Sequence, residues 1–323
     1  MTVLVLSFIK LFKILTLKNV DDIRELKKFG NLEFLARTVV EGFITGLHKS
    51  PFHGFSVEFA EHRAYNPGES VKHIDWNLYA KTDKLYIKNY EEETNLRSRI
   101  ILDISSSMLY PYKDANVMSK LAFSVYCAGA LIHLFRKQRD AVGLSFISDT
   151  LELHTPAKMS GVHTKYLYSS LETLLNKNSE QLNKQTDNGS VLRYLSDNLH
   201  KRSLIIIFSD MLSGENSEQL FSSLRQMTYN KHEVILFHVS DPKHELDFNF
   251  KNRPIKFIDM ETSEQIKLNP NQVRDIFTSK AKEHFNNLKI RCSEYNIDFV
   301  KADVNSDFKE ILIPYLLKRK MLY

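Results

Sequence analysis

The residues best suited to chemistry are one acid and two hydroxyls at alternate positions of the chain: Asp103, Ser105 and Ser107. This D-x-S-x-S motif directly follows the apolar run 99–103, which favours a buried strand that ends in the acid. Side chains at alternate positions of a loop can turn toward one point. This set offers only oxygen atoms, which suit Mg²⁺ or Mn²⁺ and not Zn²⁺. Other loops, water or a partner must complete the coordination shell.

A second acid, Asp210, ends another apolar run, residues 204–210, and is the expected companion of Asp103. Asp241 is a rival, since it too follows an apolar run and a serine. Pro242 comes directly after it and favours a role in a turn. Asp210 is therefore the second acid of the predicted site.

A third hydroxyl is expected from the polar loop between the two apolar runs. Thr186 is the first choice, and Ser190 and Thr164 are alternatives that the pattern leaves open.

The elements that must position these residues alternate between apolar strands and amphipathic helices. Strands are expected at 99–103, 142–147, 204–210, 234–239 and 297–300, and helices at 119–138, 163–176, 189–200, 217–229, 270–290 and 306–319. This alternation predicts an α/β fold, a mainly parallel sheet with helices on both faces. Ligands bind at the carboxyl ends of such strands, where both acids fall.

The part of the chain before residue 98 has a different pattern. A helix is expected over 21–47, followed by short strands such as 55–59 and 85–87. Residues 1–17 are strongly apolar but shorter than a membrane span. They fit either a helix docked on the protein's own core or an interfacial membrane anchor. We therefore predict three parts: an apolar segment at 1–20, a helix-plus-strand region at 21–97 and the α/β domain at 98–323.

Composition narrows the function classes. The net charge is +5, and no basic run exceeds three residues, so a nucleic-acid partner is not expected. The two cysteines, Cys127 and Cys292, form neither a disulfide framework nor a zinc site. A reducing cytoplasmic compartment is expected.

The acid-and-hydroxyl set resembles the metal-ion-dependent adhesion site of von Willebrand factor A-like domains, which have a Rossmann-like fold. The resemblance implies that Ser105 and Ser107 bind the metal directly and that Thr186 binds it directly or through water. It implies that Asp103 and Asp210 act mainly through water. An open coordination position would then accept an acidic side chain of a partner protein.

A second resemblance lies upstream, in an R-x-Y-x-x-G motif at 63–68, the I-D-W motif at 74–76 and the glutamates 91–93. These motifs are similar to those of the bacterial domain-of-unknown-function 58 family, and the resemblance covers most of residues 30–320. The acid-then-basic pair that commonly follows the glycine is replaced here by the sequence 69–72. A scaffold role is expected for this region, with an Arg63–Asp75 ion pair and a buried Trp76.

The family resemblance implies a partner and not a reaction. Its members resemble partners of MoxR-type AAA+ ATPases, with which they are thought to form chaperone-like systems acting on client proteins. The chain has no G-x-x-x-x-G-K-[ST] loop, so it is not expected to hydrolyse ATP, and we predict a protein that is not an enzyme. The alternative is a Mg²⁺-dependent phosphate-ester hydrolase that uses the same oxygen cluster.

Overall fold

The computed structural model describes residues 32–37, 40, 62–65, 76–88, 96–111, 118–176, 188–212, 217–260 and 264–306. The chain divides into two compact units. One is Ile44–Asn95, and the other combines Met1–Phe43 with Leu96–Tyr323. The larger unit contains the acid-and-hydroxyl motif.

The larger unit is built on a six-stranded sheet with the strand order β10-β7-β6-β3-β4-β5. The first five strands of this order are parallel, and the edge strand β5 runs antiparallel to β4. This confirms the predicted α/β fold with a mainly parallel sheet. The strands are β3 (Arg97–Asp103), β4 (Ala141–Ile147), β5 (Leu151–His154), β6 (Leu204–Ser209), β7 (Glu233–Ser240) and β10 (Asp298–Asp303).

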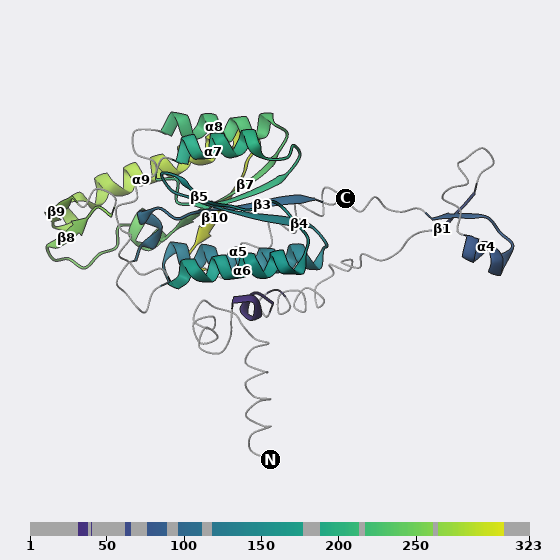
Figure 1. Ribbon diagram of the computed structural model, residues 1–323. Helices are drawn as coiled ribbons and strands as arrows, with labels where there is room; N and C mark the ends of the chain where they lie inside the picture. The colour runs from purple at the N-terminus through teal and green to yellow at the C-terminus, as the bar shows by residue number, and fades with distance from the viewer. Residues whose placement is uncertain are drawn as a thin grey trace, which may run out of the picture. The chain divides into compact units, whose positions relative to one another are not determined.

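Helices cover both faces of the sheet, as Figure 1 shows. The pair α5 and α6 lies on one face, and α7, α8 and α9 lie on the other. Their bounds are α5 (Lys120–Lys137), α6 (Gly161–Asn176), α7 (Asn188–Asn198), α8 (Ser217–Tyr229) and α9 (Pro270–Glu294). The two cysteines are free and buried, one on α5 and one on α9.

The core follows from the apolar runs of the sequence. All six residues of β6 are buried, as are six of the seven residues of β3, because helices remove both faces of these strands from water. Side chains of β3, β6 and β7 form one core with α7, α8 and α9. The carboxyl ends of these strands are therefore held in place by a close-packed core.

Among the described residues of the larger unit, the sequence pattern misses several elements, of which three bear on the site. The first is the edge strand β5. The second is the hairpin of β8 (Ile255–Ile258) and β9 (Gln265–Leu268), and the third is a π-helical turn at Pro242–Leu246, which Figure 1 does not label. The expected helix at 306–319 lies almost wholly outside the described residues.

Residues 32–37 are helical and pack on the α5–α6 pair. The Leu32 amide donates to Glu172 of α6, at 2.9 Å, and Arg136 of α5 pairs with Glu33 at 2.9 Å. The rest of the helix expected at 21–47, apart from residue 40, and the apolar segment 1–17 lie outside the described residues. Within the described part of the chain, no helix combines the length and apolarity that a membrane crossing needs.

In the smaller unit, β1 (His62–Ala64) pairs antiparallel with β2 (Tyr86–Lys88), and α4 (Trp76–Thr82) lies between them in sequence. The prediction that Trp76 is buried is wrong. Its side chain is 59% exposed at the surface of a short helix, where its ring meets only that of Tyr79, edge-on, among the described aromatic residues. Asp75, the side chain of Arg63 and the strand expected at 55–59 lie outside the described residues, and the boundaries at 20 and 97 stay predictions.

Candidate functional site

Asp103 ends β3 at the carboxyl edge of the sheet and is completely buried. One carboxylate oxygen, Oδ1, accepts the amide of Ser105 at 3.0 Å. The other, Oδ2, accepts the hydroxyl of Ser209 at 2.6 Å, from the end of the neighbouring strand β6. Asp103 thus ties the loop after β3 to the adjacent strand end.

The two serines of the motif lie side by side. Their hydroxyl oxygens, Ser105 Oγ and Ser107 Oγ, are 3.1 Å apart. Two adjacent ligands of an octahedral Mg²⁺, each at about 2.1 Å, are separated by about 3.0 Å. The Ser107 hydroxyl also faces the carboxylate of Asp210 and helps to lower the pKa of that carboxylate. The fold thus brings together Asp103, both serines and Asp210, four of the five predicted site residues.

Asp210 follows β6 and meets a cation that belongs to the protein itself. The ammonium of Lys120 donates to Asp210 Oδ2 at 2.7 Å and to Glu245 Oε1 at 2.6 Å. Lys120 is 1% exposed and Asp210 is 2% exposed, while Glu245 is 26% exposed. A buried ammonium therefore joins two carboxylates beside the serines.

The sequence interpretation missed Lys120 and Glu245. Lys120 is the first residue of α5, whose N-terminus is capped by Ser119, since its hydroxyl accepts the amide of Ala122 at 3.1 Å. One signal was present in the sequence: Lys120 falls on a helix face with Phe123 and other apolar residues, and a lysine on such a face needs a buried anion. Glu245 belongs to the π-helical turn and gives no such signal.

The two aspartates have opposite pKa shifts. Burial, and then the nearby charge of Asp210, raise the pKa of Asp103, against hydrogen bonds from Ser209 and Ser105. Burial alone would raise the pKa of Asp210, but the ammonium of Lys120 holds it below its ordinary value. Burial alone would lower the pKa of Lys120, and the carboxylates of Asp210 and Glu245 hold it above its ordinary value.

The donor set fits a divalent ion that binds through hydroxyls. In the described residues no three acidic, histidine or cysteine side chains converge into a metal cluster, so a divalent ion held here would take hydroxyl oxygens among its ligands. When Asp103, Asp210 and Glu245 are ionised, they outweigh the single charge of Lys120, and the site keeps a net negative charge for a cation to offset. Lys120 itself is engaged with the carboxylates, which leaves the paired serine hydroxyls as the direct ligands available.

The sequence offers three candidates for the third hydroxyl ligand, and the structure excludes one of them. Thr186 lies outside the described residues, and Ser190 stands in the first turn of α7. Thr164 is excluded, because it lies at the start of α6, where the adjacent His163 bonds the carbonyl of Val142 at the beginning of β4. The antiparallel strand β5, which the sequence interpretation missed, returns the chain to the amino edge of the sheet before α6 begins.

Asp241 has the turn role that Pro242 predicts. It is buried, and its Oδ2 contacts His244 Nδ1 at 2.6 Å. Its backbone carbonyl accepts the amide of Glu245 at 2.8 Å, and its own amide donates to Glu245 Oε2 at 2.7 Å. Asp241 therefore fixes the turn that carries Glu245 to Lys120.

Comparison with known proteins finds similarity to a family of proteins of unknown function, DUF58, over residues 61–287. An uncharacterized protein of Mycobacterium bovis is 21% identical over 225 residues, which cover 70% of this chain and 68% of the relative. Two uncharacterized proteins of Mycobacterium tuberculosis strains match to the same extent.

Two solved structures from Bacteroides are similar in part. The conserved hypothetical protein BatB of Bacteroides thetaiotaomicron is 16% identical and has a TM-score of 0.44, with 71% of this chain and 100% of that chain covered. An aerotolerance-related membrane protein of Bacteroides fragilis is 16% identical and has a TM-score of 0.43, with 69% and 99% covered. The family match spans more than half of the chain, and the protein described here therefore belongs to the DUF58 family.

Proposed function

We propose that this protein is a metal-dependent docking module with a von Willebrand factor A-like fold. It serves as an adaptor or co-chaperone for a MoxR-type AAA+ ATPase and its client protein. Ser105 and Ser107 hold Mg²⁺ or Mn²⁺, Asp103 and Asp210 orient the ligands, and Thr186 completes the set. An acidic side chain of the partner fills the open coordination position. The protein acts in the cytoplasm, and residues 1–17 provide a peripheral contact with the membrane.

The observation that carries this proposal is the spacing of the two serine hydroxyls, 3.1 Å apart and next to two buried carboxylates. That spacing matches two neighbouring positions of a small octahedral ion. The hydroxyls add no charge, so a bound ion stays electrophilic toward a carboxylate from outside. The same chemistry explains why docking would depend on the metal.

The hydrolase alternative has less support from the geometry. Both oxygens of the Asp103 carboxylate accept hydrogen bonds, at 3.0 and 2.6 Å, and the side chain is fully buried. A nucleophile must reach its substrate, and a carboxylate that is fully buried and held by hydrogen bonds does not. Asp210 is equally occupied by Lys120 and by the amide of Leu212. The two acids are arranged to hold the loop and not to attack a phosphorus atom.

The metal is tested by titrating Mn²⁺ into the full chain and following the free ion by electron paramagnetic resonance. We expect one ion per chain in the native protein and loss of binding in Ser107→Ala. The matched control is Ser106→Ala, from the same loop, which should bind as the native protein does. If all three proteins bind Mn²⁺ equally, the serine pair does not form the metal site.

The partner is tested by affinity capture from bacterial lysate in Mg²⁺, in EDTA and with Ser107→Ala, with mass spectrometry of the captured proteins. We expect an AAA+ ATPase in the Mg²⁺ sample alone. Capture in all three samples would keep the partner but remove the metal from the interface. Capture in none would contradict the adaptor role, and metal-dependent release of phosphate would then be the activity to assay.

A further inference from the structure

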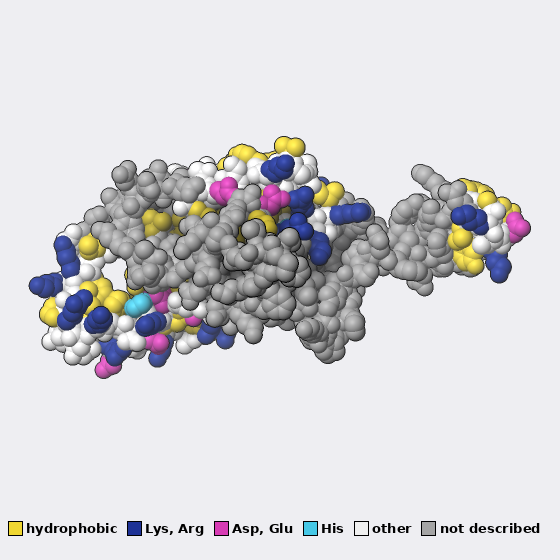
Figure 2. All heavy atoms as spheres, turned by 90° about the horizontal axis from the view of Figure 1, so that it is seen from below, with side chains coloured by type: hydrophobic (Ala, Val, Ile, Leu, Met, Phe, Trp, Pro, Cys, Tyr) yellow, Lys and Arg dark blue, Asp and Glu magenta, His cyan; other side chains and the backbone are white. Residues whose placement is uncertain are grey.

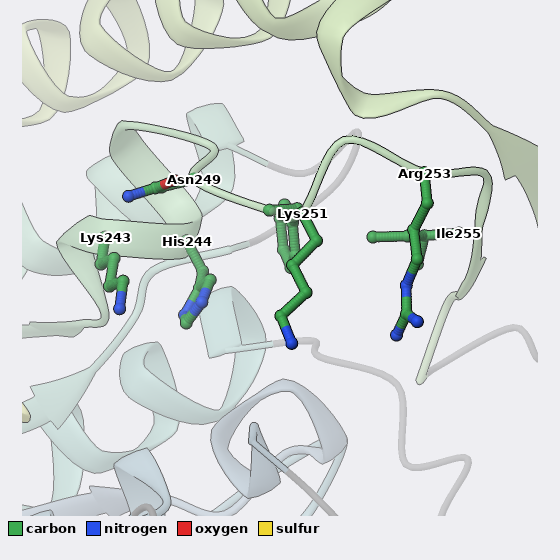
Figure 3. Close-up of a pocket in the computed structure, with 7 residues that line it drawn as sticks. Lys243, His244, Asn249, Lys251, Arg253 and Ile255 are labelled. Atoms are coloured by element: carbon green, nitrogen blue, oxygen red, sulfur yellow. The ribbon is translucent and has the colours of Figure 1, made fainter.

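A basic hollow lies next to the candidate metal site, on the segment that leads from β7 to β8. Its volume is about 450 Å³, within the range of ligand-binding pockets. Figure 3 shows that several of its side chains extend toward the same side of the ribbon. The residues that we use to define it are Lys243, His244, Phe250, Lys251, Arg253 and Ile255.

The charge of the hollow has one sign. Lys243, Lys251 and Arg253 are exposed, and no carboxylate is among the described residues that line the hollow. Within the described residues these three cations have no hydrogen-bond or ion-pair partner. Figure 2 shows Lys and Arg side chains gathered over the part of the surface that carries the β8–β9 hairpin. A ligand with several negative charges would be attracted here.

The segment that carries these cations is anchored. Phe248 is 6% exposed and packs against Phe257 of β8 and Phe277 of α9, with ring centroids 5.6 and 4.4 Å apart. Arg274 of α9 donates to the carbonyl of Asp247 at 3.3 Å. The cations are therefore presented from a backbone that is fixed to two neighbouring elements.

The hollow and the candidate metal site share a wall. Lys243 and His244 belong to the same π-helical turn as Glu245, which holds Lys120 in the site. The ring of His244 also meets Tyr110 edge-on, with centroids 6.2 Å apart, and the Tyr110 amide donates to the carbonyl of Ser107. A ligand in the hollow would therefore contact the same turn that carries Glu245 to the candidate metal site.

We infer that the basic hollow binds a carboxylate-rich segment of the same partner protein whose acidic residue reaches the metal. The inference rests on the proposed function for the identity of that partner. An extended peptide suits the hollow better than a nucleotide does, because the cations are spread along residues 243–253 and do not converge on one point. The segment 242–255 also has no glycine to form a backbone cradle for phosphate.

The test uses fluorescence anisotropy of a labelled decaglutamate peptide with the full chain at low ionic strength. The double variant Lys243→Glu/Lys251→Glu should weaken binding at least about tenfold, since two attractive contacts become repulsive. The matched control is Lys256→Glu/Lys267→Glu, which makes the same change in net charge at a cross-strand pair of the hairpin outside the hollow. It should retain most of the affinity.

Three results would overturn the inference. The native protein does not bind decaglutamate, or both double variants lose affinity equally, which would indicate general charge attraction. Alternatively, ATP binds more tightly than decaglutamate and is lost in the hollow variant, which would indicate a phosphate site.

Different experimental outcomes would disprove the inference and the proposed function. Decaglutamate binding that persists in EDTA and in Ser107→Ala, but is lost in Lys243→Glu/Lys251→Glu, supports the hollow even if metal-dependent docking is disproved. If the hollow variant still captures the AAA+ ATPase in Mg²⁺ as the native chain does, the hollow is not part of the partner interface. The inference would then be wrong and the proposed function would stand.

Discussion

Arg99 and Lys120 are both buried cations, but their surroundings differ. Arg99, near the start of β3, donates from Nη1 to the carbonyls of Leu144 and Thr155 and to the Ser145 hydroxyl. Its Nε has no partner among the described residues, and burial lowers its pKa to about 10. Lys120, at the carboxyl edge, meets two carboxylates instead.

Arg99 therefore has a structural role, whereas Lys120 belongs to the candidate site. Arg99 is held by neutral oxygens of β4 and of the residue after β5, so it links neighbouring strands, and its surroundings contain no negative charge for a metal cation to offset. Lys120 is part of a charge cluster in which acids still outnumber the base. A divalent cation would be attracted to the carboxylates around Lys120 and not to the neutral oxygens around Arg99.

The largest effect is expected from Lys120→Met, which removes the ammonium and leaves Asp210 buried without its counter-ion. Such a loss costs about 3–5 kcal/mol of unfolding free energy. Urea denaturation at pH 7 measures it. Millimolar Mg²⁺ should restore part of the stability, about 1.4 kcal/mol at ten times its Kd, because an ion in the site also offsets Asp210. A loss that Mg²⁺ does not reduce would speak against a cation site here.

Arg99→Met is the matched comparison, and its effect is expected to be smaller. It removes a buried guanidinium whose partners are neutral, and it takes a donor from the buried Thr155 carbonyl, which costs about 1–3 kcal/mol. The same denaturation experiment should show no recovery with Mg²⁺. Equal recovery in both variants would mean that Mg²⁺ stabilises the protein elsewhere, and the distinction between the two cations would be lost.

A smaller effect is expected from the buried histidine His238, whose protonation makes the free energy of unfolding depend on pH. Burial lowers its pKa to about 4, despite the opposing charge of Asp210. The unfolded chain, with an ordinary value near 6.5, binds the proton more readily. Stability is therefore full above about pH 6.5 and falls as the pH drops toward 4, by about 2 kcal/mol between pH 7 and pH 5.

The variant His238→Gln should flatten this part of the pH profile of urea denaturation. His200→Gln, which changes an exposed histidine before β6, is the control and should leave the profile unchanged. A profile that is the same in all three proteins would show that other groups set the pH dependence.

Much of the fold was predictable from local pattern. The runs 99–103 and 204–210 are apolar on both faces, and a strand of that kind must be covered twice, so the parallel sheet and its helical layers followed. Asp103 and Asp210 could be placed at one edge for the same reason. The β8–β9 hairpin was not predicted from the sequence, because its strands are mostly exposed and lack a continuous apolar face. Without β5, the pattern could not exclude Thr164.

The sequence by itself determined the parallel strands, the helices between them and the edge of the sheet where the acids and the serines meet, because hydrophobic periodicity acts between close neighbours in the chain. Only the tertiary structure decided which charges those acids meet. Lys120 lies 90 positions from Asp210 and 125 from Glu245, and their contacts depend on the strand order, which places β6 between β3 and β7. The basic hollow likewise exists only because a buried phenylalanine fixes residues 242–255 against β8 and α9.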